Sequence, residues 1–141
     1  MLMRGGGFTL VELVATMALA AVVLGTSAVS LPPLLASVRL GAAAQRLAAT
    51  LRQARGRALE RNVRIEVRLD PAQRRWRVRE WGGIDVESHQ LPAGVTFAGL
   101  PASGQVRFGT TGTSDNATIT LAAGSGVRRV IVNQRGRVRV L

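Results

Sequence analysis

The chain has 141 residues, 47% of them apolar, a length that allows one ordinary hydrophobic core and excludes a second large domain. Its formal net charge is +11, and all 19 basic residues are arginine, which favours an acidic partner such as nucleic acid or anionic lipid. The absence of cysteine excludes disulfides and thiolate chemistry, and the only histidine, His89, lacks the converging partners that a catalytic or metal site needs.

The first predicted element is an apolar helix. Between positions 8 and 38 the only charged residue is Glu12. Residues 8–31 would form a helix of about 36 Å, enough to cross a hydrocarbon core of about 30 Å. We therefore expect one membrane-spanning helix, and Arg4 before it indicates a cytoplasmic N-terminus with the rest of the chain across the membrane.

Glu12 is the unusual residue of this segment, because a carboxylate in hydrocarbon costs roughly 2.5 to 3.5 kcal/mol even on lenient insertion scales. An intramembrane acid therefore indicates a function and a partner for its charge. The alternative is a secretory signal peptide with a small-residue cleavage site at positions 27–30. Against it stand Glu12 itself and the glycine run at 5–7, which precedes the apolar stretch.

Residues 7–12 read Gly-Phe-Thr-Leu-Val-Glu and lead into the uninterrupted apolar run. This motif resembles the class III signal of type IV pilins and pseudopilins. The resemblance implies that prepilin peptidase cleaves between Gly7 and Phe8 and methylates the new amino group of Phe8, so the protein is a substrate and not an enzyme. The new terminus would be a cation in the membrane, which Glu12 could neutralise in the same subunit or a neighbouring one. In that family the pairing sets the register of assembly with other pilins.

A second helical stretch follows Pro32-Pro33 and extends to about Arg61. Apolar residues at spacings of three and four predict its buried side: Leu40, Ala44, Leu47, Leu51, Ala54 and Ala58. Arginines largely off this stripe indicate a solvated face: Arg39, Arg46, Arg52, Arg55, Arg57 and Arg61. Because proline disfavours helical geometry before it, we expect a kink or melted turn near residues 30–33 within one long helix from Phe8 to Arg61.

Beyond Asn62 the apolar period changes to two, which predicts strands. The strands are expected at residues 63–69, 76–81, 94–99, 105–109, 117–122, 127–133 and 137–141. The first two should form a hairpin around Asp70-Pro71, with Val63, Ile65, Val67 and Leu69 toward the helix and Arg64, Glu66 and Arg68 toward water. A helix followed by antiparallel strands is the order of an α+β fold.

The polar and aromatic residues of the predicted strands and loops offer no catalytic or cofactor site. Trp76 and Trp81 could stack on bases, but we expect core or edge packing. Asp115 is the lone acid of the polar loop 110–118, which disfavours a metal. Gly124-Ser125-Gly126 leads into a strand with no helix after it, which does not support a dinucleotide site. No metal or cofactor is expected.

The last two predicted strands concentrate arginine, and no acid follows Asp115. A period of two puts Arg137 and Arg139 on one face, with Gly136 permitting the tight turn before them. Guanidinium groups one strand step apart suit phosphates, although a hydrophilic strand face also attracts arginine for no specific reason.

The whole layout is similar to the GspH/FimT group of minor pilins and pseudopilins. This resemblance implies a type IV pilin-like α+β fold with a leader (1–7), a transmembrane and filament-core helix (8–31) and a periplasmic globular domain (34–141), in which the helix to about residue 61 packs on an antiparallel sheet. It implies a structural subunit of a type II secretion pseudopilus or type IV pilus, held in the inner membrane by a single pass until assembly. Its partners would be prepilin peptidase, other pilins and membrane lipid.

The same group contains a second candidate function, a DNA-binding minor pilin for natural transformation. In those members a Gly-Arg-x-Arg element near the C-terminus contributes to binding, and Gly136-Arg137-Val138-Arg139 matches it. The resemblance therefore makes Arg135, Gly136, Arg137 and Arg139 a candidate DNA-binding site. The chain lacks the cysteine pair of many FimT-like proteins, which leaves the subfamily open.

Overall fold

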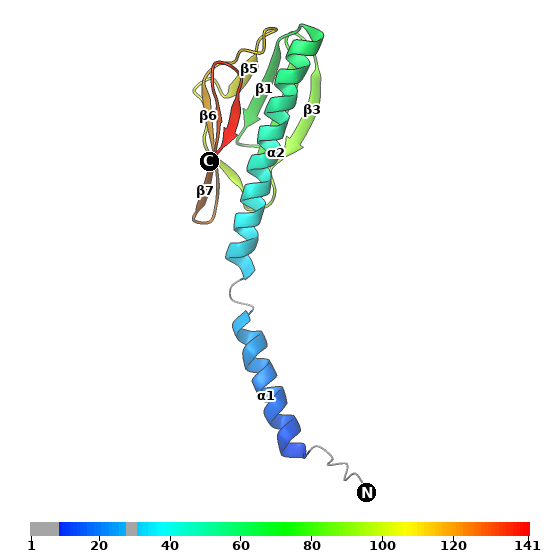
Figure 1. The fold of residues 1–141 in the computed structure, drawn as a ribbon, viewed down its shortest axis with the longest axis vertical. Helices are drawn as coiled ribbons and strands as arrows, with labels where there is room; N and C mark the ends of the chain where they lie inside the picture. Colours follow the sequence, from blue (N-terminus) through cyan, green and yellow to red (C-terminus); the bar gives the residue numbers. More distant parts are fainter. Residues whose placement is uncertain (1–8, 28–30) are drawn as a thin grey trace, which may run out of the picture. The chain divides into compact units, whose positions relative to one another are not determined.

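The computed structural model describes residues 9–27 and 31–141 and divides the chain into two compact units, residues 1–34 and 35–141. Two helices come first, α1 (Leu10–Ser27) and α2 (Leu31–Arg61), and eight strands follow (Figure 1). The predicted cleavage site, Gly7 and Phe8, lies outside the described residues.

Helix α1 is apolar on every side, and each of its side chains described, from Leu10 to Leu24, is exposed. Thr9 caps the helix, because its Oγ1 accepts a hydrogen bond from the backbone N–H of Glu12 at 3.3 Å. Glu12 is the one acid of the first turn. Within the two described ranges, no helix has both the length and the apolar character needed to cross a membrane.

Pro32 and Pro33 are themselves helical, although an interruption was expected near residues 30–33. Pro32 and Pro33 lie in the first turn of α2, which begins at Leu31. Proline is tolerated there because the first backbone N–H groups of a helix have no intrahelical acceptor. Residues 28–30, between α1 and α2, lie outside the described part of the chain, so the continuous helix expected from Phe8 to Arg61 stays a prediction.

The strands are antiparallel, as predicted, but they form two four-stranded sheets where one sheet was expected. The first sheet has the order β3-β2-β1-β5 and consists of β3 (Asp85–Gln90), β2 (Arg75–Glu80), β1 (Ile65–Asp70) and β5 (Gln105–Phe108). The second has the order β4-β6-β7-β8 and consists of β4 (Thr96–Gly99), β6 (Ala117–Ala123), β7 (Gly126–Val132) and β8 (Val138–Val140). Sequence reasoning missed β3, an edge strand with no apolar alternation.

One core joins α2 to both sheets, and all six residues of the predicted helix stripe are buried in it. Trp76 of β2 and Phe108 of β5 are its largest side chains, and Ile119 of β6 and Val130 of β7 come from the second sheet. Trp76 is fully buried, so the packing prediction for it is confirmed, whereas Trp81 follows β2 at the surface. The core thereby fixes the end of the chain against α2.

Glu66 is buried, which contradicts the prediction that it faces water. It lies on the outer face of the first sheet, in register with Arg79 of β2 and Arg107 of β5. The Nε atom of Arg68 is 3.5 Å from its Oε2 atom. Long side chains on the same face can cover a residue that the strand period assigns to solvent.

Candidate functional site

A groove lies between α2 and the end of the chain, within the second unit. Its volume is about 310 Å³. Four of the residues that line it are arginines, and the full lining is Arg52, Arg55, Gly136, Arg137, Val138 and Arg139. None of the lining residues is acidic, and we call this site the arginine groove.

Two arginines of α2 hold the helix against the other side of the arginine groove. Nη2 of Arg52 donates to the carbonyl oxygen of Val138 at 3.3 Å, and Nε of Arg55 donates to the carbonyl oxygen of Gly112 at 3.0 Å. A guanidinium group has five N–H donors, so these bonds fix each side chain and leave most of its donors for another acceptor. The arrangement is therefore a set of cations held in place before any ligand arrives.

The arginine face of α2 is thus not simply solvated, which corrects the sequence expectation. Besides Arg52 and Arg55, Arg57 forms an ion pair with Glu87, and Nη1 of Arg61 is 2.8 Å from Oε1 of Glu80. The apolar period of the helix does not reveal these bonds, because a long arginine side chain can reach from the flank of a helix to a neighbouring sheet.

The turn before β8 is built from glycine and asparagine. Gly136 has a φ of 69°, and a Cβ atom there would lie 2.3 Å from the carbonyl oxygen of Gly112 and 2.7 Å from Nε of Arg55. Oδ1 of Asn133 accepts hydrogen bonds from the backbone N–H groups of Arg135 at 3.1 Å and Arg137 at 2.9 Å. Asn133 was not singled out from the sequence, although asparagine at the end of a strand is a turn signal.

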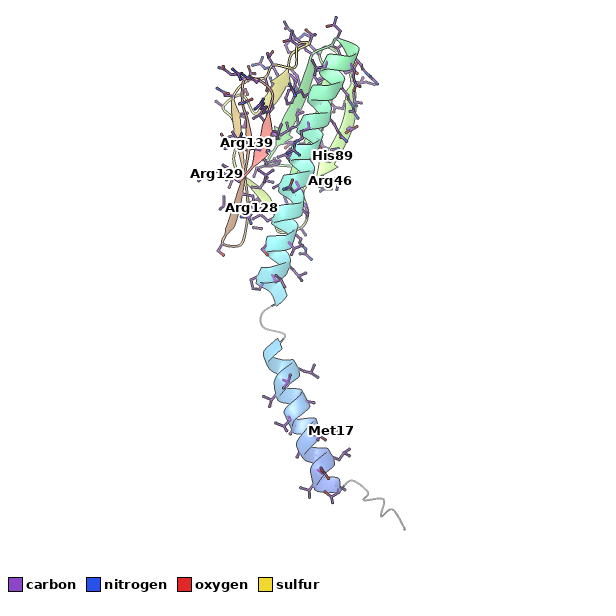
Figure 2. All side chains as sticks on the ribbon, viewed as in Figure 1. Met17, Arg46, His89, Arg128, Arg129 and Arg139 are labelled. Atoms are coloured by element: carbon purple, nitrogen blue, oxygen red, sulfur yellow. The ribbon has the colours of Figure 1, made fainter. Side chains whose placement is uncertain are left out.

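Beyond the turn, β8 presents its arginines as the period of two predicts. Arg137 and Arg139 are exposed, and Val138 between them is buried. Arg139 pairs with Ile131 of β7, so Arg129, two residues before Ile131, lies on the same face of the sheet (Figure 2). This face extends the positive charge of the arginine groove, and its spaced guanidinium groups can bind several phosphates or carboxylates.

Glu12 and His89, which were also considered from the sequence, do not line the arginine groove. The side chain of Glu12 is exposed, and its proposed partner, the amino group of Phe8, lies outside the described residues. Nε2 of His89 is 3.2 Å from Oε2 of Glu87, and its ring packs against Trp76. The hydrogen bond from Arg57 lowers the pKa of Glu87, and the bond to His89 adds to this effect, which together outweigh the opposing effect of burial. No group of three metal-ligating side chains occurs in the described ranges.

Comparisons with known proteins agree on family and fold. Residues 43–136 match the family model described as Type II transport protein GspH. The minor pilin FimU of Pseudomonas aeruginosa (strain PAO1) has a TM-score of 0.59 at 20% identity, covering 72% of this chain and 87% of FimU. The minor pseudopilin EpsH from the type 2 secretion system of Vibrio cholerae has a TM-score of 0.62 at 19% identity, covering 73% and 96%.

A second structure of EpsH gives a TM-score of 0.63 at 14% identity, covering 74% of this chain and 96% of EpsH. A search among curated protein sequences found no match. At these identities the structural likeness concerns the fold, and it confirms the predicted pilin-like α+β architecture.

Proposed function

This chain belongs to the GspH family, and from that premise we propose that it is a minor pseudopilin or pilin, a structural subunit of a type II secretion pseudopilus or type IV pilus. The observation that carries the proposal is helix α1. Its apolar side chains are exposed around the whole helix, including Leu10, Met17 and Leu24. A helix that is hydrophobic all round is normally buried, so α1 requires a partner outside the chain.

That partner is lipid before assembly and the equivalent helices of other subunits afterwards. We place residues 8–31 in the inner membrane as a single pass, with the globular domain in the periplasm. The composition of the segment supports this placement, because Glu12 is its only charge. In the filament the same apolar surface packs against neighbouring helices. The subunit is not an enzyme in this proposal and needs no cofactor.

Processing by prepilin peptidase creates the end of that helix. Cleavage between Gly7 and Phe8 leaves a methylated amino group four residues before Glu12. The exposed Glu12 carboxylate in the first turn of α1 supports its role as the countercharge, supplied within the subunit or to a neighbour. Removing that carboxylate should block assembly without unfolding the globular domain, because α1 belongs to the first unit.

Intact-mass spectrometry of the membrane-purified chain tests the proposal. In a host with an active prepilin peptidase, we expect loss of residues 1–7 and the added mass of one methyl group. Gly7→Ala should reduce cleavage strongly, whereas Gly5→Ala, a matched change in the same glycine run, should leave it intact. Retention of residues 1–7 in the wild-type chain would contradict the proposed processing.

The arginine groove supports a second candidate function, DNA binding by a minor pilin of the FimT type. Arg135, Arg137 and Arg139 would contact phosphates, and Gly136 would keep the turn closely packed against α2. The supporting observation is the convergence of Arg52, Arg55, Arg137 and Arg139 on one groove whose lining contains no acid.

Salt-dependent binding of the full chain, in neutral detergent, to labelled mixed-sequence DNA tests this function. The Arg137→Ala, Arg139→Ala variant should reduce the slope of log affinity against log salt by about 1.4 to 1.8 for two lost phosphate contacts. The control is Arg39→Ala, Arg46→Ala, an equal loss of charge from exposed arginines on α2. Equal slopes in the two variants would show that Arg137 and Arg139, in the hairpin of β7 and β8, do not form the DNA-binding site.

A further inference from the structure

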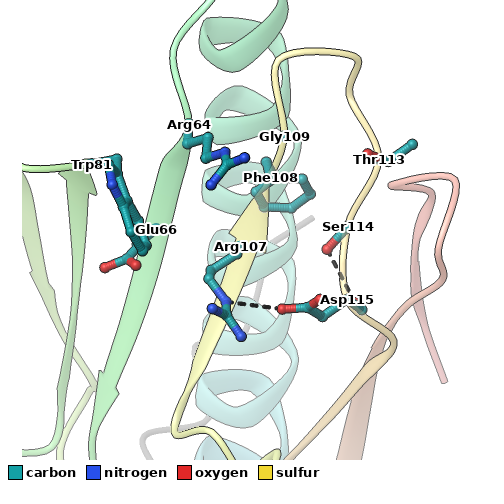
Figure 3. Close-up of a pocket in the computed structure, with 9 residues that line it drawn as sticks. All are labelled: Arg64, Glu66, Trp81, Arg107, Phe108, Gly109, Thr113, Ser114 and Asp115. Atoms are coloured by element: carbon teal, nitrogen blue, oxygen red, sulfur yellow. Dashed lines mark hydrogen bonds and ion pairs between the residues drawn. The ribbon is translucent and has the colours of Figure 1, made fainter.

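A second cleft, which shares no lining residue with the arginine groove, lies beside the exposed ring of Trp81 (Figure 3). Its volume is about 330 Å³. It is formed by the start of β1, the residue after β2, the end of β5 and the loop that follows β5. The lining consists of Arg64, Glu66, Trp81, Arg107, Phe108, Gly109, Thr113, Ser114 and Asp115, and we call this site the Trp81 cleft.

The floor of the Trp81 cleft contains a carboxylate that already has its countercharges. The side chain of Glu66 is only 7% exposed, and Arg68 lies 3.5 Å from it. Arg79 and Arg107 flank it in register on the neighbouring strands. A ligand cation would have to pass these arginines to reach a nearly covered carboxylate. Glu66 is therefore a nearly covered carboxylate that is paired with Arg68 and has an arginine beside it on each neighbouring strand.

Two guanidinium groups in the cleft retain unused donors. No hydrogen bond or ion pair of the Arg64 side chain occurs within the described ranges, and its guanidinium carbon lies 5.9 Å from the centre of the Trp81 ring. Arg107 donates from Nε to Oδ2 of Asp115 at 3.0 Å, which leaves its two terminal nitrogens. Figure 3 shows Asp115 on the loop across the cleft from Arg107.

Trp81 gives the cleft an apolar wall. Its side chain is 56% exposed, and the next large residue, Ile84, is 84% exposed. The backbone N–H of Trp81 donates to the carbonyl oxygen of Arg64 at 2.9 Å, so the ring and the guanidinium group are positioned together. Tryptophan and arginine are both enriched among the residues that dominate the binding energy of protein interfaces.

We propose that the Trp81 cleft binds a glutamate or aspartate side chain of a protein partner. The partner's carboxylate bonds to Arg64 and Arg107, and its methylene groups pack on the ring of Trp81. A single carboxylate is favoured over a phosphate chain because Glu66 and Asp115 balance the formal charges of Arg64 and Arg107 in the lining, whereas the arginine groove has four arginines and no acid. The site does not depend on DNA binding or on leader processing.

A nuclear magnetic resonance titration of the labelled full chain in neutral detergent tests this site. The probe is acetyl-glutamate methylamide, and the matched neutral probe is acetyl-glutamine methylamide. Saturable shifts are expected for the indole N–H of Trp81 and the Nε–H groups of Arg64 and Arg107, with the carboxylate probe alone. The indole N–H of Trp76 is the internal reference, because that ring is fully buried.

Variants complete the test. Arg64→Gln and, separately, Arg107→Gln should each weaken probe binding about tenfold, the loss expected for one charged hydrogen bond. Arg46→Gln, an exposed change outside the cleft, should have no effect, and an unchanged Trp76 signal shows that each variant is folded. Equal shifts with the glutamine probe, equal shifts at Arg129, or tighter binding of inorganic phosphate would each overturn the proposal.

Discussion

Replacing Gly136 by alanine should destabilise the globular domain far more than the same change in another turn. Alanine at a φ of 69° costs about 1–2 kcal/mol. Its Cβ atom would also lie 2.3 Å from the carbonyl oxygen of Gly112 and 2.7 Å from Nε of Arg55. The hydrogen bond between those groups must then break, which costs about 1.5–3 kcal/mol for a charged donor. The expected loss in the free energy of unfolding is about 2.5–5 kcal/mol.

The matched control is Gly124→Ala in the turn between β6 and β7. Gly124 has a φ of 56°, and a Cβ atom there would have no atom within 4 Å, so only the backbone cost of about 1–2 kcal/mol applies. Urea unfolding followed by tryptophan fluorescence measures both variants. Equal losses at the two positions would refute the packing argument. Arg55→Ala removes one of the two groups with which the new Cβ atom would clash. The double variant with Gly136→Ala should therefore lose less free energy of unfolding than the sum of the two single variants.

Three further changes test the fold. Leu47→Ala should cost about 2–5 kcal/mol, because the side chain is fully buried; a loss below about 1 kcal/mol in urea unfolding would contradict its place in the core. Glu66→Gln should cost about 1–3 kcal/mol by the same assay, whereas Glu60→Gln on the exposed end of α2 should change stability by less than about 0.5 kcal/mol. Glu87→Gln should cost about 0.5–1 kcal/mol at neutral pH by loss of the ion pair with Arg57. The pKa of Glu87 is lowered in the folded chain, so that stabilisation is present above the ordinary value of 4.5 and is lost as the pH falls through the lower folded value; a gap between variant and wild type that persists in acid would contradict it.

The spacing of apolar residues predicted the helix and the strands that have one side facing the core. Every residue of the stripe from Leu40 to Ala58 is buried, and the hairpin of β1 and β2 forms around Asp70 as expected. These predictions succeed because burial of one side imposes a period that local sequence must carry. Strand β3 has no such side, since its residues are exposed or half-buried, and it could not be recognised.

Only the part of the arginine groove that lies in residues 136–139 was predicted from the sequence. The period of two placed Arg137 and Arg139 on an exposed face, and glycine indicated the turn at Gly136. The contribution of α2 was not predictable, because Arg52 reaches Val138 across 86 positions of sequence. Glu66 was misplaced for the same reason: Arg79 and Arg107 lie beside it on other strands, and the pattern of a single strand does not contain them.

The hydrogen bond from Arg52 to the carbonyl oxygen of Val138 also affects strand pairing between two copies of the chain. Strand β8 is an edge of the second sheet, and an unpaired edge can recruit a strand from another molecule. This edge is only three residues long, carries arginine, and has one of its carbonyl groups already bonded to a helix. Such an edge is a poor template for sheet growth, so it disfavours amyloid-like pairing between copies of the chain.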